Sequence, residues 1–153
     1  MIRPATPDDH EVLLDLWEDL NRNGSEADPR YRPTADARAQ MKTYTANSWF
    51  EQVPFPRCLV ADDDGVVGFI HGFPRTAVPV IDLAPTVRIG DLYVAPSHRR
   101  SGVGRSLVQA MPSWAKAAGH PRAEVGTLTA DARAVAFWRS MGFGDWQISL
   151  SRD

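Results

Sequence analysis

The amino-acid sequence predicts one domain of the α+β class. Its 153 residues are about the length of one domain and are enough to bury a sizeable core. Strand-like and helix-like segments alternate along the chain, without repeats or a low-complexity linker. Hydrophobic residues make up 43% of the chain and charged residues 24%, as in an ordinary soluble globular protein. We therefore expect residues 1–153 to form a single domain that combines helices and strands.

The first third of the chain predicts a short strand and two helices. After an apolar start at residues 1–2, Thr6 can cap a helix whose apolar positions share one face: Val12, Leu13, Leu16, Trp17 and Leu20. A second helix is expected from Thr34, with a weaker face made of Ala37, Met41, Tyr44 and Ser48.

The middle of the chain predicts a hairpin, a long loop and a further strand. Residues 57–73 form two apolar runs around a turn at 62–65, and an Asp-Gly pair in that position is a hairpin signal. Residues 74–86 carry three prolines and should form a long loop. The apolar stretch at 87–94 predicts a strand that ends before Pro96.

A helix follows, because apolar residues recur every three or four positions: Val103, Leu107, Met111, Trp114 and Ala118. Pro112 lies inside this segment and lacks a backbone donor, so we expect a kink or a change to a second short helix there. Gly119 is expected to end the segment.

The C-terminal part predicts a strand, a helix and a last strand. Residues 122–128 form the apolar run of the first strand. Asp131 can cap a helix that runs to about Met141, with Gly142 as its C-terminal cap. The tail at 143–150 alternates like a final strand.

Composition argues against several classes of protein. The net charge is −2, and the positive charge is almost all arginine, since Lys42 and Lys116 are the only lysines, so nucleic acid is not favoured as a partner. No run is long enough to span a membrane, and the start lacks the apolar core of a secretory signal. Cys58 is the only cysteine and is expected in the core, and no Cys/His cluster has zinc spacing. We therefore expect a cytoplasmic protein without a metal.

The loop SHRRSGVGRSL at 97–107, between a strand and a helix, predicts an anion site. The first amides of a helix are unpaired and carry a partial positive charge. Gly102 and Gly104 lack side chains, so an anion can come close to these amides. Full charges are added by Arg99, Arg100 and Arg105. A doubly charged pyrophosphate fits this loop better than a lone carboxylate.

Two other phosphate-binding patterns do not fit the loop. The GxxxxGK[ST] pattern fails because the loop has no lysine, and the GxGxxG pattern has Leu107 where its third glycine should be. The two glycines could also be ordinary turn residues, with the arginines as a solvated face. What remains is the pattern R-x-x-G-x-G at 99–104.

This pattern resembles the GNAT family of acyl-CoA-dependent N-acetyltransferases. Residues 91–108 resemble the family's core motif, and residues 128–143 its next strand-to-helix motif, which ends in glycine-phenylalanine. The stretches at 1–9 and 60–72 stand where the family has its first three strands. The resemblance implies a mixed, mostly antiparallel central sheet that is flanked by helices and has its fourth and fifth strands splayed apart.

The resemblance also implies a function, the transfer of an acetyl group from acetyl-CoA to a primary amine of a small molecule or peptide. By resemblance, the main chain of Leu92 and Val94 would contact the pantetheine arm, and Arg99, Asp131 and Trp138 would lie beside the coenzyme. The backbone amides that would hold its pyrophosphate are those of Arg100, Ser101, Gly102, Val103, Gly104 and Arg105.

Direct attack needs an uncharged amine, so a base is expected. Asp91 is the first candidate and could act through a water, although it could equally be a fixed polar partner; His71 is a weaker candidate. The family's usual acid for the departing sulfur is a tyrosine, but this chain has Trp138 there, and indole has no useful acidity. Tyr93, water or unaided departure of the thiolate could replace that acid.

The acceptor is less well defined. Four acidic residues could attract a cationic amine and four aromatic ones could form an apolar wall: Glu26, Asp28, Asp36 and Asp82, and Trp49, Phe50, Phe55 and Phe73. The same residues could be ordinary surface charges and core aromatics. Two function classes stay open, a transferase and an acyl-CoA-binding or sensor module with weakened chemistry, for which Trp138 is the sequence argument. A homodimer is possible in either class.

Overall fold

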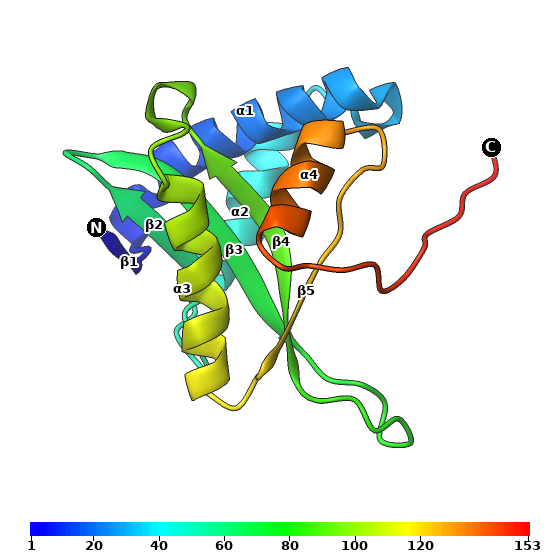
Figure 1. Ribbon diagram of the computed structural model, residues 1–153. Helices are drawn as coiled ribbons and strands as arrows, with labels where there is room; N and C mark the ends of the chain where they lie inside the picture. The colour runs from blue at the N-terminus through cyan, green and yellow to red at the C-terminus, as the bar shows by residue number, and fades with distance from the viewer.

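The computed structural model describes residues 1–153 and is built around a five-stranded sheet (Figure 1). The strands lie side by side in chain order: β1 (Ile2–Pro4), β2 (Cys58–Asp62), β3 (Val66–Arg75), β4 (Thr86–Val94) and β5 (Arg122–Val125). The first four pair antiparallel with their neighbours, while β5 pairs parallel with β4. The expected mixed, mostly antiparallel sheet is confirmed.

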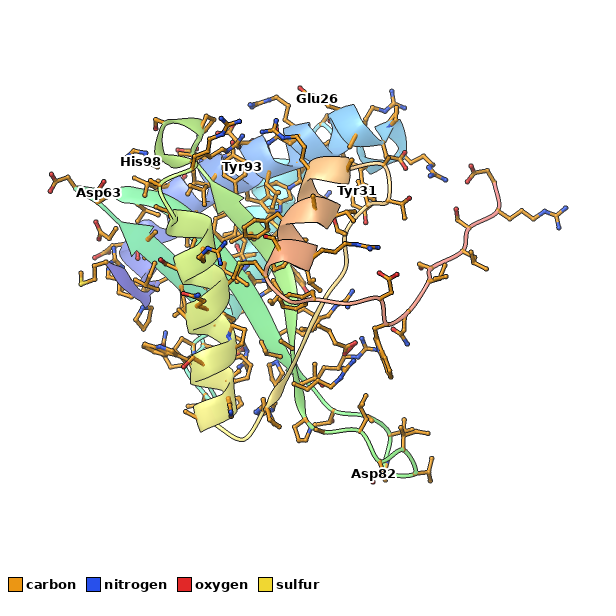
Figure 2. The ribbon with its side chains drawn as sticks, in the orientation of Figure 1. Glu26, Tyr31, Asp63, Asp82, Tyr93 and His98 are labelled. Carbon is orange, nitrogen blue, oxygen red and sulfur yellow. The ribbon has the colours of Figure 1, made fainter.

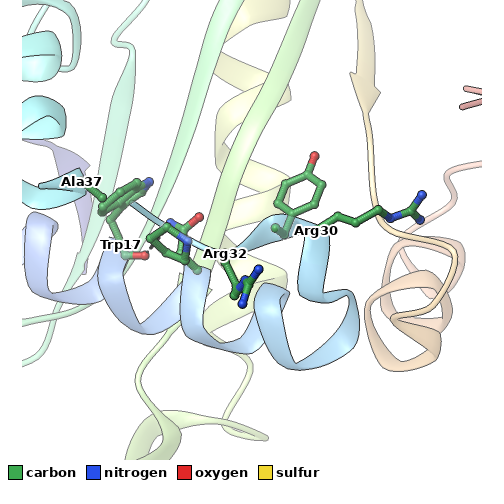
Figure 3. A pocket seen from close by; sticks show the side chains of 7 residues that line it. Trp17, Arg30, Arg32 and Ala37 are labelled. Atoms are coloured by element: carbon green, nitrogen blue, oxygen red, sulfur yellow. Dashed lines mark hydrogen bonds between the residues drawn. The ribbon is translucent and has the colours of Figure 1, made fainter. Parts of the chain in front are cut away.

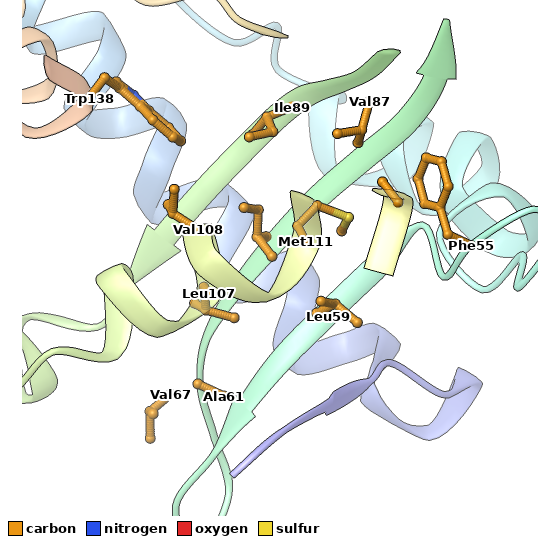
Figure 4. Packing of buried hydrophobic residues seen from close by; sticks show 12 residues of the cluster. Phe55, Leu59, Ala61, Val67, Val87, Ile89, Leu107, Val108, Met111 and Trp138 are labelled. Carbon is orange, nitrogen blue, oxygen red and sulfur yellow. The ribbon is translucent and has the colours of Figure 1, made fainter. Parts of the chain in front are cut away.

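Helices cover both faces of the sheet. They are α1 (His10–Ala27), α2 (Ala37–Ser48), α3 (Val103–Ala117) and α4 (Ala132–Ser140). One apolar cluster joins α1 and Trp49 to the sheet, and a second joins α3 and α4 to its other face. In Figure 4, Leu107, Val108 and Met111 of α3 face the strands of this second cluster. The approach is close, because a Cβ on Gly72 would lie 3.1 Å from the sulfur of Met111.

The first helix begins where the sequence predicts. Thr6 precedes a 3₁₀ turn, Pro7–Asp9, that continues into α1, and the Asp9 carboxylate accepts a hydrogen bond from the Thr6 amide at 2.8 Å. Arg3 bridges this turn to the sheet, with 2.8 Å ion pairs to Asp9 and Asp62. Hydrogen bonds from Arg3 lower the pKa of both carboxyl groups. The bridge therefore fixes the start of α1 against β1 and β2.

Several local predictions are confirmed. The hairpin turn lies between β2 and β3, and Gly119 and Gly142 end their helices with positive φ angles of 88° and 90°. Asp131 caps α4, since its carboxylate accepts a hydrogen bond from the Ala134 amide at 3.0 Å. Cys58 is fully buried, and burial raises the pKa of its thiol.

Three expectations are corrected. The second helix begins at Ala37, and its buried position is Thr45, while Tyr44 is 77% exposed. The expected change to a second helix at Pro112 does not occur: α3 continues to Ala117. Buried residues on both sides of the proline hold α3 against the sheet, and this packing outweighs the one hydrogen bond that is lost. The tail at 143–150 forms no strand, because no neighbouring strand pairs with it. None of the helices has the length and apolar character needed to cross a membrane.

Candidate functional site

A β-bulge in β4 positions the site. His71 of β3 pairs with Asp91 of β4, and the next residue, Gly72, pairs with Ile89, so Gly90 is an extra residue without a partner. The last pair between β4 and β5 joins Ile89 to Val125. Beyond the bulge, β4 continues to Val94 while β5 has ended. This separation confirms the expected splay, and we call it the split.

The bulge also reverses the faces of β4. Before it, Val87 and Ile89 belong to the apolar cluster under α3. After it, Leu92 and Val94 pack on that cluster, whereas Tyr93 belongs to the cluster under α1. Since side chains alternate along a strand, Asp91 shares the face of Tyr93. Without the extra residue, Asp91 would lie on the same face as Ile89.

The main chain of β4 faces the split at alternate residues. The Ala95 amide donates to Val67 of β3 at 2.8 Å, so the amide of Ala95 points towards β3. Backbone groups of successive residues in a strand point to opposite sides. The amide of Tyr93 therefore points the same way as that of Ala95, and the amides of Leu92 and Val94 point the opposite way. They therefore point away from β3, towards the split.

The arginine and glycine loop ends beside this strand. Arg100 and Gly102 have positive φ angles of 60° and 89°, and α3 begins at Val103. None of the backbone amides from Arg100 to Arg105 donates a hydrogen bond within the chain. A Cβ on Gly104 would lie 3.6 Å from the Phe137 ring of α4 and 3.7 Å from the Val94 side chain. Six consecutive free amides thus lie where the loop, α4 and the end of β4 converge.

The arginines of the loop differ in their partners. Arg99 donates to the carbonyl of Val94 at 2.8 Å, and its guanidinium lies 5.2 Å from the centre of the Tyr93 ring. Its charge is therefore directed to the end of β4. Arg100 and Arg105 are exposed and form no ion pair or side-chain hydrogen bond, so their charges are free to meet an anion at the amides. Ser101 donates its hydroxyl to the carbonyl of His98.

His71 and Asp91 form the titratable pair of the site. Nδ1 of His71 is 3.3 Å from Oδ2 of Asp91, and both side chains are mostly buried. This contact is not a hydrogen bond, and Nδ1 is buried without a hydrogen-bond partner. The imidazole also contacts the rings of Trp49 and Phe73. A carboxylate and an imidazole therefore lie side by side next to the bulge, on the α1 face of the sheet.

Trp138 packs in the cluster under α3. It is 8% exposed and meets the rings of Phe137 and Phe143 edge on. Its indole Nε1 makes no hydrogen bond within the chain, and it is not among the fully buried atoms that lack a partner. The N–H edge of this buried ring thus remains in contact with solvent.

The four acidic residues considered for the acceptor do not gather into one surface. Glu26 and Asp82 lie at opposite ends of the molecule (Figure 2). Asp28 is paired with Arg30 at 2.8 Å, and Asp36 accepts hydrogen bonds from residues of its own segment. Of the four aromatic candidates, Trp49 and Phe55 are core residues that are 1% exposed. Phe73, beside His71, is the aromatic candidate that is both exposed and near the split.

A shallow hollow of about 340 Å³ lies elsewhere, between α1 and the segment before α2 (Figure 3). It is lined by Trp17, Asn21, Arg30, Tyr31, Arg32, Pro33 and Ala37. No residue of β4 or of the loop at 97–107 contributes to it, so it is separate from the split.

Two residues of the site were missed by the sequence analysis. Gly90 makes the bulge, and an isolated glycine inside a strand pattern is a signal for one. Arg88 lies on β4 two residues before the bulge, half-buried and without an ion pair or hydrogen bond within the chain. In the sequence, the available signal for Arg88 was a charged residue between the apolar residues Val87 and Ile89.

Several solved structures have the same fold as this chain. A variant of the BH1408 protein from Bacillus halodurans has 22% identity and a TM-score of 0.78, and the match covers 100% of this chain and 98% of that one. The aminoglycoside antibiotic 6'-N-acetyltransferase AAC(6')-IG from Acinetobacter haemolyticus has 21% identity and a TM-score of 0.76, with 100% and 97% covered. AAC(6')-Iy in complex with the bisubstrate analogue CoA-S-monomethyl-acetylneamine has 22% identity and a TM-score of 0.72, with 100% and 97% covered.

A family model matches most of the sequence. Residues 13–143 match the family model described as the Acetyltransferase (GNAT) family. This span includes β2 to β5, the loop and all of α2, α3 and α4. The chain therefore belongs to the GNAT acetyltransferase family.

Proposed function

We propose that this protein transfers the acetyl group of acetyl-CoA to a primary amine. The observation that carries the proposal is the split between β4 and β5 beside the six unpaired amides of residues 100–105. An extended amide-containing arm and a pyrophosphate are the two parts of a coenzyme that such neighbouring features can bind. Further support comes from AAC(6')-Iy, a protein of the same fold in complex with a CoA bisubstrate analogue.

The free amides fit the pyrophosphate. Backbone N–H groups at the start of a helix attract anions, and Arg100 and Arg105 add full positive charges beside them. The outward-facing backbone groups of Leu92 and Val94 can pair with the amides of the pantetheine arm as an added strand would. Asp131, Trp138 and Arg99 are proposed neighbours of the coenzyme. For Asp131 and Arg99, the hydrogen bonds to Ala134 and Val94 restrict how far they can reach.

The chemistry follows from the groups around the split. Bound acetyl-CoA supplies the acetyl group as a thioester. The Val94 amide can donate a hydrogen bond to a carbonyl oxygen on which negative charge develops. Asp91 accepts the proton of the attacking amine, directly or through a water, and the contact with His71 holds its carboxylate in place. Tyr93 or water can protonate the departing sulfur, because the indole of Trp138 cannot.

A coenzyme-binding module with weakened chemistry is the second candidate. It is favoured by Trp138, which stands at the usual tyrosine position and has an N–H that can donate a hydrogen bond to a ligand but does not release its proton. Both candidates require acetyl-CoA to bind, and only the first requires the acetyl group to leave.

Calorimetric titration with acetyl-CoA tests the proposal. Gly104→Leu would place a side chain against Phe137 and among the free amides, so binding should be lost. Gly144→Leu is the matched control, since a Cβ there meets nothing within 4 Å, and it should bind as the wild type does. Circular dichroism verifies that both variants fold. A wild type that does not bind acetyl-CoA refutes both candidates, and binding without transfer to any amine favours the second.

A further inference from the structure

Arg88 lies beside the split on the face of the sheet that carries Asp91. It pairs with Phe73 of β3 and with Glu124 of β5. A Cβ built on Gly126, the first residue after β5, would lie 2.7 Å from Nη2 of Arg88. Because Gly126 lies two residues beyond Glu124, the guanidinium extends along the strand towards the split. Gly126 itself is exposed, and Arg88 is half-buried.

The charge of Arg88 is not neutralised within the chain. The carboxylate that pairs with it across the sheet is that of Glu124, which is 5% exposed and already occupied. Arg122 holds one Glu124 oxygen at 3.0 Å, and Arg75 lies 3.8 Å from the same oxygen. Arg88 makes neither an ion pair nor a hydrogen bond, although it is half-buried. A half-buried guanidinium usually has a partner, since removing it from water without one costs free energy.

The charges on this face are arranged in two zones. Arg75 and Arg122 lie at the carboxylate of Glu124, and Arg88 pairs with Glu124 in the sheet, so three positive charges stand against one negative charge in this zone. Asp91, in contact with His71, lies beyond the bulge and is the carboxylate that β4 itself contributes. Arg88 and Asp91 lie opposite Phe73 and His71, which are two residues apart on β3, so they are separated by roughly 7 Å along the strand before the reach of the side chain is counted. One small molecule can therefore contact both zones.

We propose that the acceptor is a primary amine that also carries an anionic group, with a carboxylate as the simplest case, and that Arg88 binds this group. The inference rests on the proposed acetyl transfer and names its substrate class. The amine lies near Asp91 and the split, and the anion forms a two-pronged contact with the guanidinium. Phe73, paired with Arg88 and exposed, covers the apolar chain between the two groups. A polycationic acceptor would place positive charge against three arginines and is disfavoured.

The test compares linear ω-amino acids with α,ω-diamines of the same length, as acceptors of wild type and Arg88→Gln. Wild type should acetylate the amino acid with a kcat/KM about 10-fold or more above that of the diamine. Arg88→Gln should lose about 10- to 100-fold on the amino acid, mainly in KM, and nothing on the diamine. Arg22→Gln, an exposed and remote arginine on α1, is the control. Aminoalkyl phosphates of the same length are a third series of acceptors and show whether the site prefers a phosphate or a carboxylate. A higher kcat/KM of the wild type for either anionic acceptor than for the diamine supports the inference.

A binding measurement accompanies the kinetics. In the absence of coenzyme, the amino acid should raise the melting temperature of the wild type and not that of Arg88→Gln. Preference of the wild type for diamines, or an equal loss on both acceptors in Arg88→Gln, overturns the inference while acetyl-CoA binding and amine acetylation remain. Failure of the proposed function is different, because the calorimetric titration then shows no binding of acetyl-CoA.

Discussion

Replacement of Gly90 by alanine tests whether the bulge positions the site. The added Cβ would lie 3.0 Å from Nδ1 of His71 and 3.6 Å from the ring of Phe73. The first distance is shorter than an ordinary contact, so the imidazole must move by a few tenths of an ångström. Overpacking of this kind costs about 1–3 kcal/mol. The lower end applies because His71 is not enclosed on every side, and for a chain of this size about 1 kcal/mol lowers the melting temperature by about 2–4 °C.

A double-mutant cycle isolates this contact. In a His71→Ala background the imidazole is absent, so Gly90→Ala should cost little or nothing in the free energy of unfolding, measured by urea denaturation. The coupling between the two positions should be about 1 kcal/mol. Gly144→Ala serves as the control, since its Cβ meets nothing within 4 Å. Equal costs of Gly90→Ala in both backgrounds would refute the packing argument.

The same variant should reduce turnover. Movement of His71 changes its 3.3 Å contact with Asp91, whereas the free amides of the loop are unaffected. We therefore expect kcat to fall several-fold and the affinity for acetyl-CoA, measured by calorimetry, to stay the same. A lower affinity at unchanged kcat would mean that the bulge shapes the coenzyme site instead.

Three further predictions concern other parts of the chain. The hydrogen bond from Arg3 lowers the pKa of Asp9, so the stability that this carboxylate contributes is present above the unfolded pKa near ~4 and lost as pH falls through the folded pKa. Asp9→Asn should therefore lower stability at neutral pH by about 1–3 kcal/mol and flatten its fall at acidic pH, as acid titrations of urea midpoints would reveal. Gly24→Ala, inside α1 and facing open space, should raise the free energy of unfolding by about 0.5–1 kcal/mol, and a decrease would contradict this. Trp138→Tyr should raise kcat about 10-fold or more if a missing acid limits the rate, and an unchanged kcat would show that another group already protonates the sulfur.

The parts of the fold that the sequence predicts are those specified by local chemistry. Asp131 caps α4 by a bond to an amide three residues away, and Gly142 ends it with a positive φ, so both signals act within one turn. The tail at 143–150 is different. Its alternation is a property of the segment, but a strand also needs a neighbour, and no strand pairs with this segment. Pro112 shows the reverse case, in which tertiary packing overrides a local signal.

Among the site residues, too, those with a local sequence signal could be identified and those that depend on the fold could not. The loop at 97–107 could be identified because a glycine pair before a helix has a local meaning, and its amides are free as the pattern predicts. Asp82 lies 46 residues after Asp36 in the chain, so only the fold decides whether it meets Glu26, Asp28 and Asp36, and Glu26 and Asp82 lie at opposite ends of the molecule. Ion pairing within one segment, as for Asp28 with Arg30, also removes charges that the sequence leaves apparently available.

The bulge at Gly90 links the split to the chemistry of its face. With strict alternation, Asp91 would share a face with Val87 and Ile89 and would lie in the apolar cluster under α3, where a carboxylate without a partner is costly. The extra residue turns Asp91 towards His71 at the position where β4 loses its pairing with β5. Arg88 lies before the bulge and is on the same face of the sheet as Asp91, which lies after it. One inserted residue therefore places the carboxylate of Asp91, the imidazole of His71 and the unpaired guanidinium of Arg88 on the same face of the sheet. Since Arg88 lies on the face of Asp91 and not among the free amides of the loop, its replacement should change the choice of acceptor rather than the binding of coenzyme.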